Sequence, residues 1–130
     1  MTKQELITTT LEKMGYQPTV DDDGDITFRY QLKHLYVMNS EKEEPFVTLL
    51  FPQFTDVEDG KELLVLGACN KLTRDLKLVK VYIDQTFKNV SASCDFYYTD
   101  EEALEDNLKR GLHILGAIRT LFRKELSELS

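Results

Sequence analysis

A helix that runs into a pair of alternating strands constrains this chain more than any other feature. Between residues 68 and 96, a helical segment with Ala68, Cys69 and Leu72 gives way to a pattern of period two. Apolar residues then occupy every second position of two runs, namely Val79, Val81 and Ile83, followed by Val90, Ala92, Cys94 and Phe96. Alternation places such side chains on one face of a strand, and a short polar connection makes the two strands antiparallel neighbours. The segment therefore predicts a helix followed by a β-hairpin.

The first helix is marked at both ends. Thr2 and Glu5 have the spacing of a capping box, in which the hydroxyl accepts from a free amide and the carboxylate reaches back. An apolar stripe at helical spacing follows, made of Leu6, Ile7, Leu11 and Met14. Gly15 stands where a left-handed C-terminal cap is expected.

Three strands are expected between this helix and the next one. Ile26, Phe28 and Tyr30 alternate with polar residues, which is typical of a half-buried strand. The predicted strands are residues 26–30, 35–38 and 46–51, joined by a turn at 31–34 and a polar loop at 39–45. We expect Pro52 to end the third strand, because proline has no N–H group to donate to a neighbouring strand.

Two further helices complete the pattern. The second is expected at about residues 58–75. Its broad apolar face indicates burial on two sides, by the sheet and a partner subunit, and a fully buried core helix explains this face equally well. The third is expected to open with another capping box, Thr99 with Glu102, and to run for roughly 28 residues of about 1.5 Å each. The order α-β-β-β-α-β-β-α predicts one α+β domain over residues 1–130, with two layers and an antiparallel sheet packed by helices.

Charge and composition exclude several classes of partner. The net charge of −7 is opposite to that of a typical nucleic-acid binder. The densest basic cluster, Lys71, Arg74, Lys77 and Lys80, is interleaved with Asp75 and Asp84, so a solvated face explains it better than a phosphate site. The N-terminus lacks an apolar signal region, and no apolar run approaches the roughly 20 residues of a membrane span. We expect a cytoplasmic protein that binds neither nucleic acid nor membranes.

No motif of catalysis or metal binding stands out. The acidic run at 21–25 resembles a calcium loop, but alignment on Gly24 places Thr19 and Tyr30 at the end positions where ligands are needed. Turn chemistry explains the run better. The histidines, His34 and His113, have no metal-binding spacing, and we expect no catalytic residue, metal or cofactor. Cys94 falls on an apolar strand face, where burial blunts the reactivity of a thiol.

The helix-to-hairpin segment carries a family resemblance. The run Ala68-Cys69-Asn70-Lys71-Leu72, followed by Lys80-Val81-Tyr82-Ile83-Asp84, resembles the YbjN-like family of bacterial proteins, whose fold is similar to that of type III secretion chaperones. The acidic start of the third helix at 99–102 and the stretch 24–28 also fit this family. Where the family usually has a glycine-containing turn, this chain has residues 31–34. The resemblance implies a non-enzymatic role in protein binding or regulation, and it supplies no catalytic residues.

The leading hypothesis is therefore a protein-interaction module, either chaperone-like or regulatory, that acts as a homodimer on an unknown protein partner. Exposed strand edges can accept an extended peptide through backbone hydrogen bonds. The candidate partner surface is Tyr30, Tyr36, Phe51 and Phe54, for each of which core packing is the commoner role. The candidate dimer surface on the second helix is Leu63, Leu66 and Asn70.

Two alternatives stay open at this point. One is a small-ligand sensor or an uncharacterised enzyme with a pocket between the sheet and the helices, which a buried polar cluster in a cavity would favour. The other is a chaperone-like regulator that binds its partner only under stress, which sequence cannot separate from the leading hypothesis.

Overall fold

A computed structural model of the chain describes residues 1–39 and 44–130. Most of the polar loop expected at 39–45 lies outside the described residues. The helices are α1 (Lys3–Lys13), α2 (Glu62–Asp75) and α3 (Glu101–Leu129). The strands are β1 (Thr19–Val20), β2 (Ile26–Tyr30), β3 (Lys33–Val37), β4 (Phe46–Asp56), β5 (Val79–Ile83) and β6 (Asn89–Tyr97).

All six strands form one antiparallel sheet in the order β1-β2-β3-β4-β6-β5. Strand β6 pairs with both β4 and β5, because the chain crosses from β4 through α2 to the outer strand and then returns. The predicted α+β fold class is confirmed. The two-residue strand β1, which pairs with β2 at the far edge, was not expected from the sequence.

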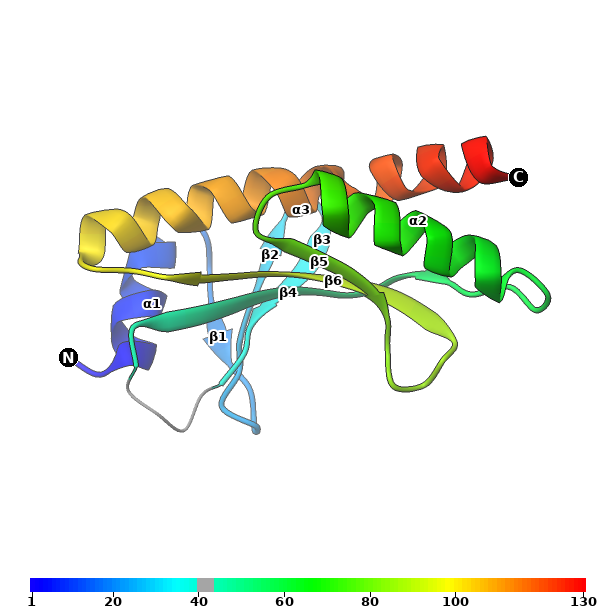
Figure 1. The fold of residues 1–130 in the computed structure, drawn as a ribbon. Coiled ribbons are helices and arrows are strands. Elements are labelled where there is room, and N and C mark those ends of the chain that lie inside the picture. Colours follow the sequence, from blue (N-terminus) through cyan, green and yellow to red (C-terminus); the bar gives the residue numbers. More distant parts are fainter. Residues whose placement is uncertain (40–43) are drawn as a thin grey trace.

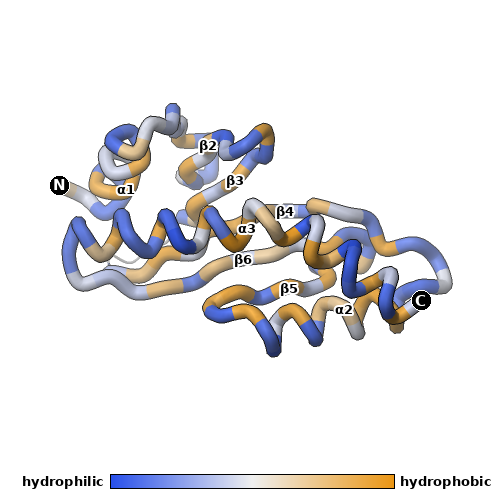
Figure 2. Tube along the Cα trace, turned by 90° about the horizontal axis from the view of Figure 1, so that it is seen from above, coloured by the Kyte–Doolittle hydropathy of each residue, from blue (hydrophilic) through white to orange (hydrophobic). Residues whose placement is uncertain are grey.

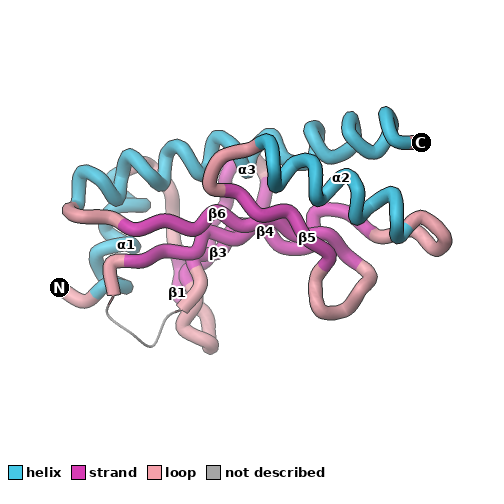
Figure 3. Tube along the Cα trace, viewed as in Figure 1, coloured by secondary structure: helices cyan, strands magenta, loops and turns pink. Residues whose placement is uncertain are grey.

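The sheet is covered on one face. Helices α2 and α3 lie together on one side of β4, β5 and β6, and the other side of these strands carries no helix in the described part of the chain (Figures 1 and 3). The core between the helices and the sheet consists of apolar side chains, among them Leu49, Val81, Cys94, Leu112 and Leu115. Viewed from above, α2 runs alongside β5 at the margin of the sheet (Figure 2).

The helix termini confirm one predicted cap and correct the other. Thr2 and Glu5 form the capping box, and Gly15 takes φ +99° after α1. The predicted box of Thr99 with Glu102 is wrong: the N-cap of α3 is Asp100, whose carboxylate accepts from the Ala103 amide at 2.7 Å. An aspartate one residue later fills the same role as a threonine hydroxyl, and its charge also suits the helix dipole.

Strand β4 continues to Asp56, so the predicted end at Pro52 is wrong. The pairing of β4 with β6 is irregular between Phe51 and Thr55. A β-bulge tolerates proline because its residues are not all paired. The next residue, Gln53, has φ +47°, and its amide donates to the Ser91 hydroxyl at 2.8 Å.

Two other boundaries differ from the prediction. The turn between β2 and β3 contains only Gln31 and Leu32, both with positive φ, so β3 begins at Lys33 instead of residue 35. Such a two-residue turn matches the twist of the strands it joins. Helix α2 begins at Glu62 instead of residue 58, because the preceding residues form a turn in which Gly60 has φ +86°.

Candidate functional site

Strand β5 is the longer of the two free edges of the sheet. It has five residues, whereas β1 at the opposite edge has two. In an antiparallel pair, successive residues direct their backbone groups alternately toward and away from the partner strand. The Val81 amide bonds to a side chain outside the sheet, which places the backbone groups of Val79, Val81 and Ile83 on the free edge. This edge is the place where the sheet could accept another strand.

The centre of this edge is occupied by a side chain from α2. The Thr73 hydroxyl accepts from the Val81 amide at 2.9 Å and donates to the Val81 carbonyl oxygen at 3.2 Å. Thr73 lies in the last turn of α2, which reaches the margin of the sheet just before the chain enters β5. A single hydroxyl thus satisfies both edge-facing backbone groups of one residue.

A shallow groove of about 520 Å³ lies beside this edge. Its lining residues come from α2 and three strands: Thr48, Thr73, Lys80, Val81, Tyr82, Ser93 and Asp95. Ser93 is only 3% exposed and lies at the base of the groove. Tyr82 is 37% exposed, so part of its ring is available for contact.

An ion pair crosses the groove. The Lys80 Nζ atom lies 2.6 Å from Asp95 Oδ2, and this hydrogen bond raises the pKa of Lys80. The other oxygen, Asp95 Oδ1, is buried and has no hydrogen-bond partner among the described residues. A buried oxygen without a donor loses the solvation that water would give it. This oxygen therefore carries a desolvation cost that no donor among the described residues offsets.

Tyr36 lies on the same uncovered face as the groove. It pairs with Leu50 on β4, Leu50 pairs with Ser93 on β6, and Ser93 pairs with Lys80 on β5. These four residues form one row across the sheet, because paired residues in neighbouring strands point to the same face. Tyr36 is half-buried and lies on β3, outside the lining of the groove.

The other three predicted partner residues lie on the helix-covered face. Phe51 and Phe54 are buried and stack at 5.5 Å between ring centroids, and the Arg119 guanidinium lies 5.5 Å from the centre of the Phe51 ring. Tyr30 is half-buried and packs against Tyr16. The structure does not gather the four residues into one surface. The two phenylalanines pack in the core, which is the commoner role expected for such residues from the sequence.

The outer side of α2 exposes the predicted dimer surface. Leu63 is 81% exposed and Leu66 is 51% exposed, and Asn70 is exposed on the same helical stripe. The opposite stripe of α2, which includes Val65, Cys69 and others, is buried against the core. We call Leu63, Leu66 and Asn70 the α2 stripe, and its role in self-association stays a prediction.

The acidic turn at 21–25 has an internal explanation. The Asp21 carboxylate accepts from the amides of Asp23 and Asp25, at 3.0 and 2.9 Å. Carboxylate oxygens of Asp21, Asp23 and Asp25 lie within 4.8 Å of one another, but these bonds are those of a tight turn. The Asp25 carboxylate also accepts from the Asn39 amide at 2.6 Å. The cluster therefore ties two loops together.

Both cysteines are unsuited to nucleophilic chemistry. Cys69 and Cys94 are buried free thiols, and burial raises the pKa of each to about 11. The thiolate is the reactive form, and it is scarce at neutral pH when the pKa is this high. His34 and His113 are exposed on β3 and α3.

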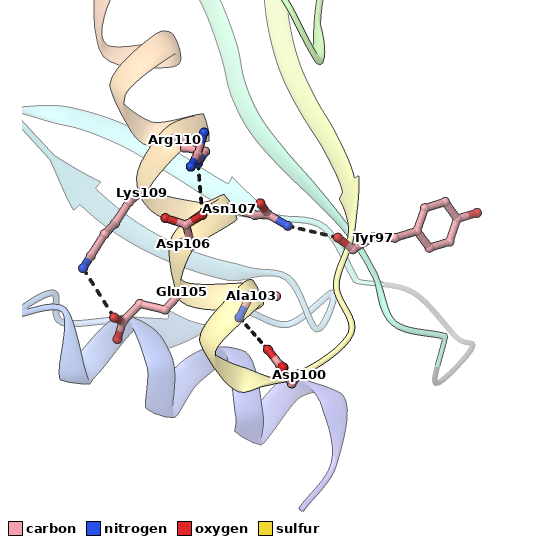
Figure 4. A network of polar contacts seen from close by, with 8 residues as sticks. All are labelled: Tyr97, Asp100, Ala103, Glu105, Asp106, Asn107, Lys109 and Arg110. Atoms are coloured by element: carbon pink, nitrogen blue, oxygen red, sulfur yellow. Dashed lines mark hydrogen bonds and ion pairs between the residues drawn. The ribbon is translucent and has the colours of Figure 1, made fainter.

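The start of α3 carries a surface network of ion pairs. Lys109 pairs with Glu105 at 3.4 Å, and Arg110 pairs with Asp106 at 3.0 Å, each one turn along the helix (Figure 4). The Asn107 amide donates to the Tyr97 carbonyl oxygen at 3.1 Å, which joins α3 to the end of β6. The charged side chains pair within α3, and Asn107 bonds to β6, so this network positions α3.

Sequence reasoning missed Thr73 as a site residue. The period-two pattern places Lys80 and Tyr82 opposite the buried side of β5, so their exposure could have been inferred. The bond from Thr73 to Val81 has no local sequence signal, because it depends on how the turn after α2 returns the chain.

Among the described residues, no helix is long and apolar enough to cross a lipid bilayer.

Comparison with known proteins agrees with the fold. Residues 2–127 match the family described as "T3SS (YopN, CesT) and YbjN peptide-binding chaperone 1". The crystal structure of YbjN from E. coli, described as a candidate transcription regulator, is similar with a TM-score of 0.57. It is 8% identical, and the alignment covers 89% of this chain and 91% of that one, so the likeness shows the fold alone. No curated protein sequence matches the chain. Because the family match spans nearly the whole sequence, the chain belongs to the family of peptide-binding chaperones that includes YbjN and the type III secretion chaperones.

Proposed function

We propose that this protein is a non-enzymatic, chaperone-like or regulatory module that holds an extended peptide segment of a protein client along β5. The observation that carries the proposal is the free edge of β5 with a groove beside it, in a chain of a peptide-binding family. The proposal treats residues 1–130 as one domain, since a single sheet contains strands from both halves of the chain.

Backbone hydrogen bonds supply the first part of the binding energy. A peptide that lies beside β5 pairs with the edge-facing groups of Val79, Val81 and Ile83, which any sequence other than proline can do. Its side chains alternate between the two faces. Those on the uncovered face meet Tyr82 and the Lys80–Asp95 pair, so the groove selects among client sequences.

The alternative of a small-ligand site between sheet and helices finds less support. That layer is filled by apolar side chains such as Leu49, Cys94 and Leu112, and a ligand site would need converging polar groups there. The protonated thiols of Cys69 and Cys94 also argue against covalent catalysis at neutral pH. Two free thiols are the normal state in a reducing compartment, which supports a cytoplasmic location.

The proposal includes a homodimer formed through the α2 stripe. Leu63 and Leu66 expose apolar side chains that a second copy could cover. We expect Leu66→Asp to reduce the mass in solution, measured by light scattering over a concentration series, from a dimer to a monomer of 15.1 kDa. Leu32→Asp, at a turn residue that is 91% exposed, is the matched control and leaves the dimer intact. A folded Leu66→Asp protein of unchanged mass would remove α2 as the interface.

Peptide binding itself is tested by selection from a phage-displayed library of random dodecapeptides, followed by calorimetry with the selected peptides. We expect Ser93→Lys to abolish binding, because a long charged side chain then fills the groove. Thr27→Lys is the control: Thr27 pairs with Tyr36, so it lies in the same row of the sheet but far from β5. If no peptide is selected, or if Ser93→Lys binds as well as the wild type while both are folded, the proposed site is wrong.

A further inference from the structure

The bond between Thr73 and Val81 reproduces the contact that an added strand would make. Two residues that face each other in an antiparallel hydrogen-bonded pair exchange two bonds, one from each amide to the other carbonyl. In this protein the Thr73 hydroxyl takes both positions at Val81, as acceptor at 2.9 Å and as donor at 3.2 Å. The side chain therefore substitutes for one residue of a missing strand.

Val81 is also the central position of the edge. It has Val79 on one side and Ile83 on the other, and all three direct backbone groups outward. A peptide that pairs with both Val79 and Ile83 must pass Val81, so it cannot bind in register while Thr73 stays in place. Natural proteins protect exposed edges in such ways, because an unprotected edge pairs with other chains.

From this geometry we infer that Thr73 is a gate on the β5 edge, closed in the free protein and displaced when a client strand binds. The inference rests on the proposed function and adds how the same site is regulated. Thr73 is exposed, so its hydroxyl moves into water when it leaves Val81. The two displaced bonds are replaced by two bonds to the client backbone. Thr73 is thus a positioning residue for the edge: it blocks unspecific strand pairing and weakens every client by the same factor.

The hydroxyl can be removed with little change in shape. Thr73→Val is nearly isosteric, and valine and threonine have similar helix propensities. Thr73→Ala removes the hydroxyl by a second route and favours the helix, whereas Thr73→Ser keeps the hydroxyl. With the hydroxyl gone, a peptide no longer has to break the two bonds between Thr73 and Val81. Because the displaced hydroxyl of the wild type bonds to water instead, the net gain in affinity is about three- to tenfold.

The test measures the Val81 amide and peptide affinity in the same set of variants. Without peptide, we expect hydrogen exchange at the Val81 amide to be slow in the wild type and in Thr73→Ser, and faster in Thr73→Val and Thr73→Ala. The probe is a dodecapeptide selected on the wild type. We expect it to bind the valine and alanine variants about three- to tenfold more tightly than the wild type and Thr73→Ser.

Each contrary result has a separate meaning. If Val81 exchanges equally fast in all four proteins, Thr73 does not protect the edge and the gate is excluded. If exchange rises in the valine and alanine variants but affinity stays equal or falls, the gate is excluded while peptide binding stands. If none of the four proteins binds a selected peptide, the proposed function fails and the gate fails with it.

Discussion

The two faces of β6 carry different kinds of side chain. On the covered face, Val90, Ala92, Cys94 and Phe96 are all buried beneath the helices. On the uncovered face, the same strand presents Ser91, Ser93, Asp95 and Tyr97. The serines are buried as deeply as the apolar residues, each at 3% exposure, although no described helix covers this side of β6 (Figure 1).

The difference assigns stability to the covered face and client recognition to the uncovered face. Helix α3 lies close to the covered face at Gly111, where an added Cβ atom would stand 3.1 Å from Leu49 Cδ2 and 3.3 Å from Cys94 Sγ. That face is therefore fully used by the core. The uncovered face instead has small buried hydroxyls at its base, with the exposed part of Tyr82 and the Lys80–Asp95 ion pair at its surface, and these last groups are the ones that a client can contact.

Adjacent substitutions on β6 give the largest contrast. Phe96→Ala removes a ring that is 5% exposed, and we expect a loss of about 3–5 kcal/mol in the free energy of unfolding. Tyr97→Ala removes a ring that is 68% exposed and contacts Phe46 at 4.9 Å, and the expected loss is about 0.5–1.5 kcal/mol. Urea unfolding of both variants measures this. Equal losses would mean that the two faces contribute alike to stability.

Asp84 tests whether a charged carboxylate on the uncovered side contributes to the free energy of unfolding. Its carboxylate accepts from Thr86 Oγ1 at 2.5 Å and from Gln53 Nε2 at 2.9 Å, and these bonds lower its pKa. Because the pKa is lower in the folded state than in the unfolded state, the stabilisation is complete above the ordinary value near 3.8 and is lost as the pH falls below it.

We therefore expect Asp84→Asn to reduce stability at neutral pH and to flatten the acid limb of the stability curve. Urea unfolding of the wild type and the variant across pH 2 to 7 measures both effects. Parallel curves for the two proteins below pH 4 would show that Asp84 does not carry this acid sensitivity.

The Lys80–Asp95 pair gives the smallest expected effect on stability. Lys80 is mostly solvated, with 62% of its side chain exposed, and such pairs contribute about 1 kcal/mol or less. Lys80→Met keeps the apolar stem, and its loss of stability shrinks as salt is added because the interaction is screened. Lys80→Arg is the control that retains the charge. A salt-independent loss of several kcal/mol would place the pair in the core instead of the groove.

Local patterns predicted most of the fold. Three predicted features are confirmed, namely the capping box of Thr2 with Glu5, the alternation of β2 and the β5–β6 hairpin. Each depends on residues that are close together in the sequence. Two of the errors arose where distant residues decide. Pro52 does not end β4, because Ser91 and Asp84 hold the bulge that follows it. Strand β1 is too short to leave a pattern and exists through its pairing with β2.

The candidate site was less predictable for the same reason. The sequence indicates partner anchors only through aromatic residue type, whereas Phe51 and Phe54 are buried because Arg119 and Phe122 of α3 pack on them. The groove instead depends on Thr73 from a helix and Asp95 from a strand, brought together by tertiary packing. The exposure of Leu63 and Leu66 was better signalled, because α2 has more apolar residues than one buried stripe requires.

One measurement tests the central claim that clients pair with β5. The ¹⁵N-labelled wild-type protein is titrated with a dodecapeptide selected on it, and amide shifts and hydrogen exchange are followed. We predict the largest changes in β5 and at Thr73, with slower exchange at the edge amides of Val79 and Ile83. Changes confined to β1, at Thr19 and Val20, or to the α2 stripe, with β5 unaffected, would contradict it.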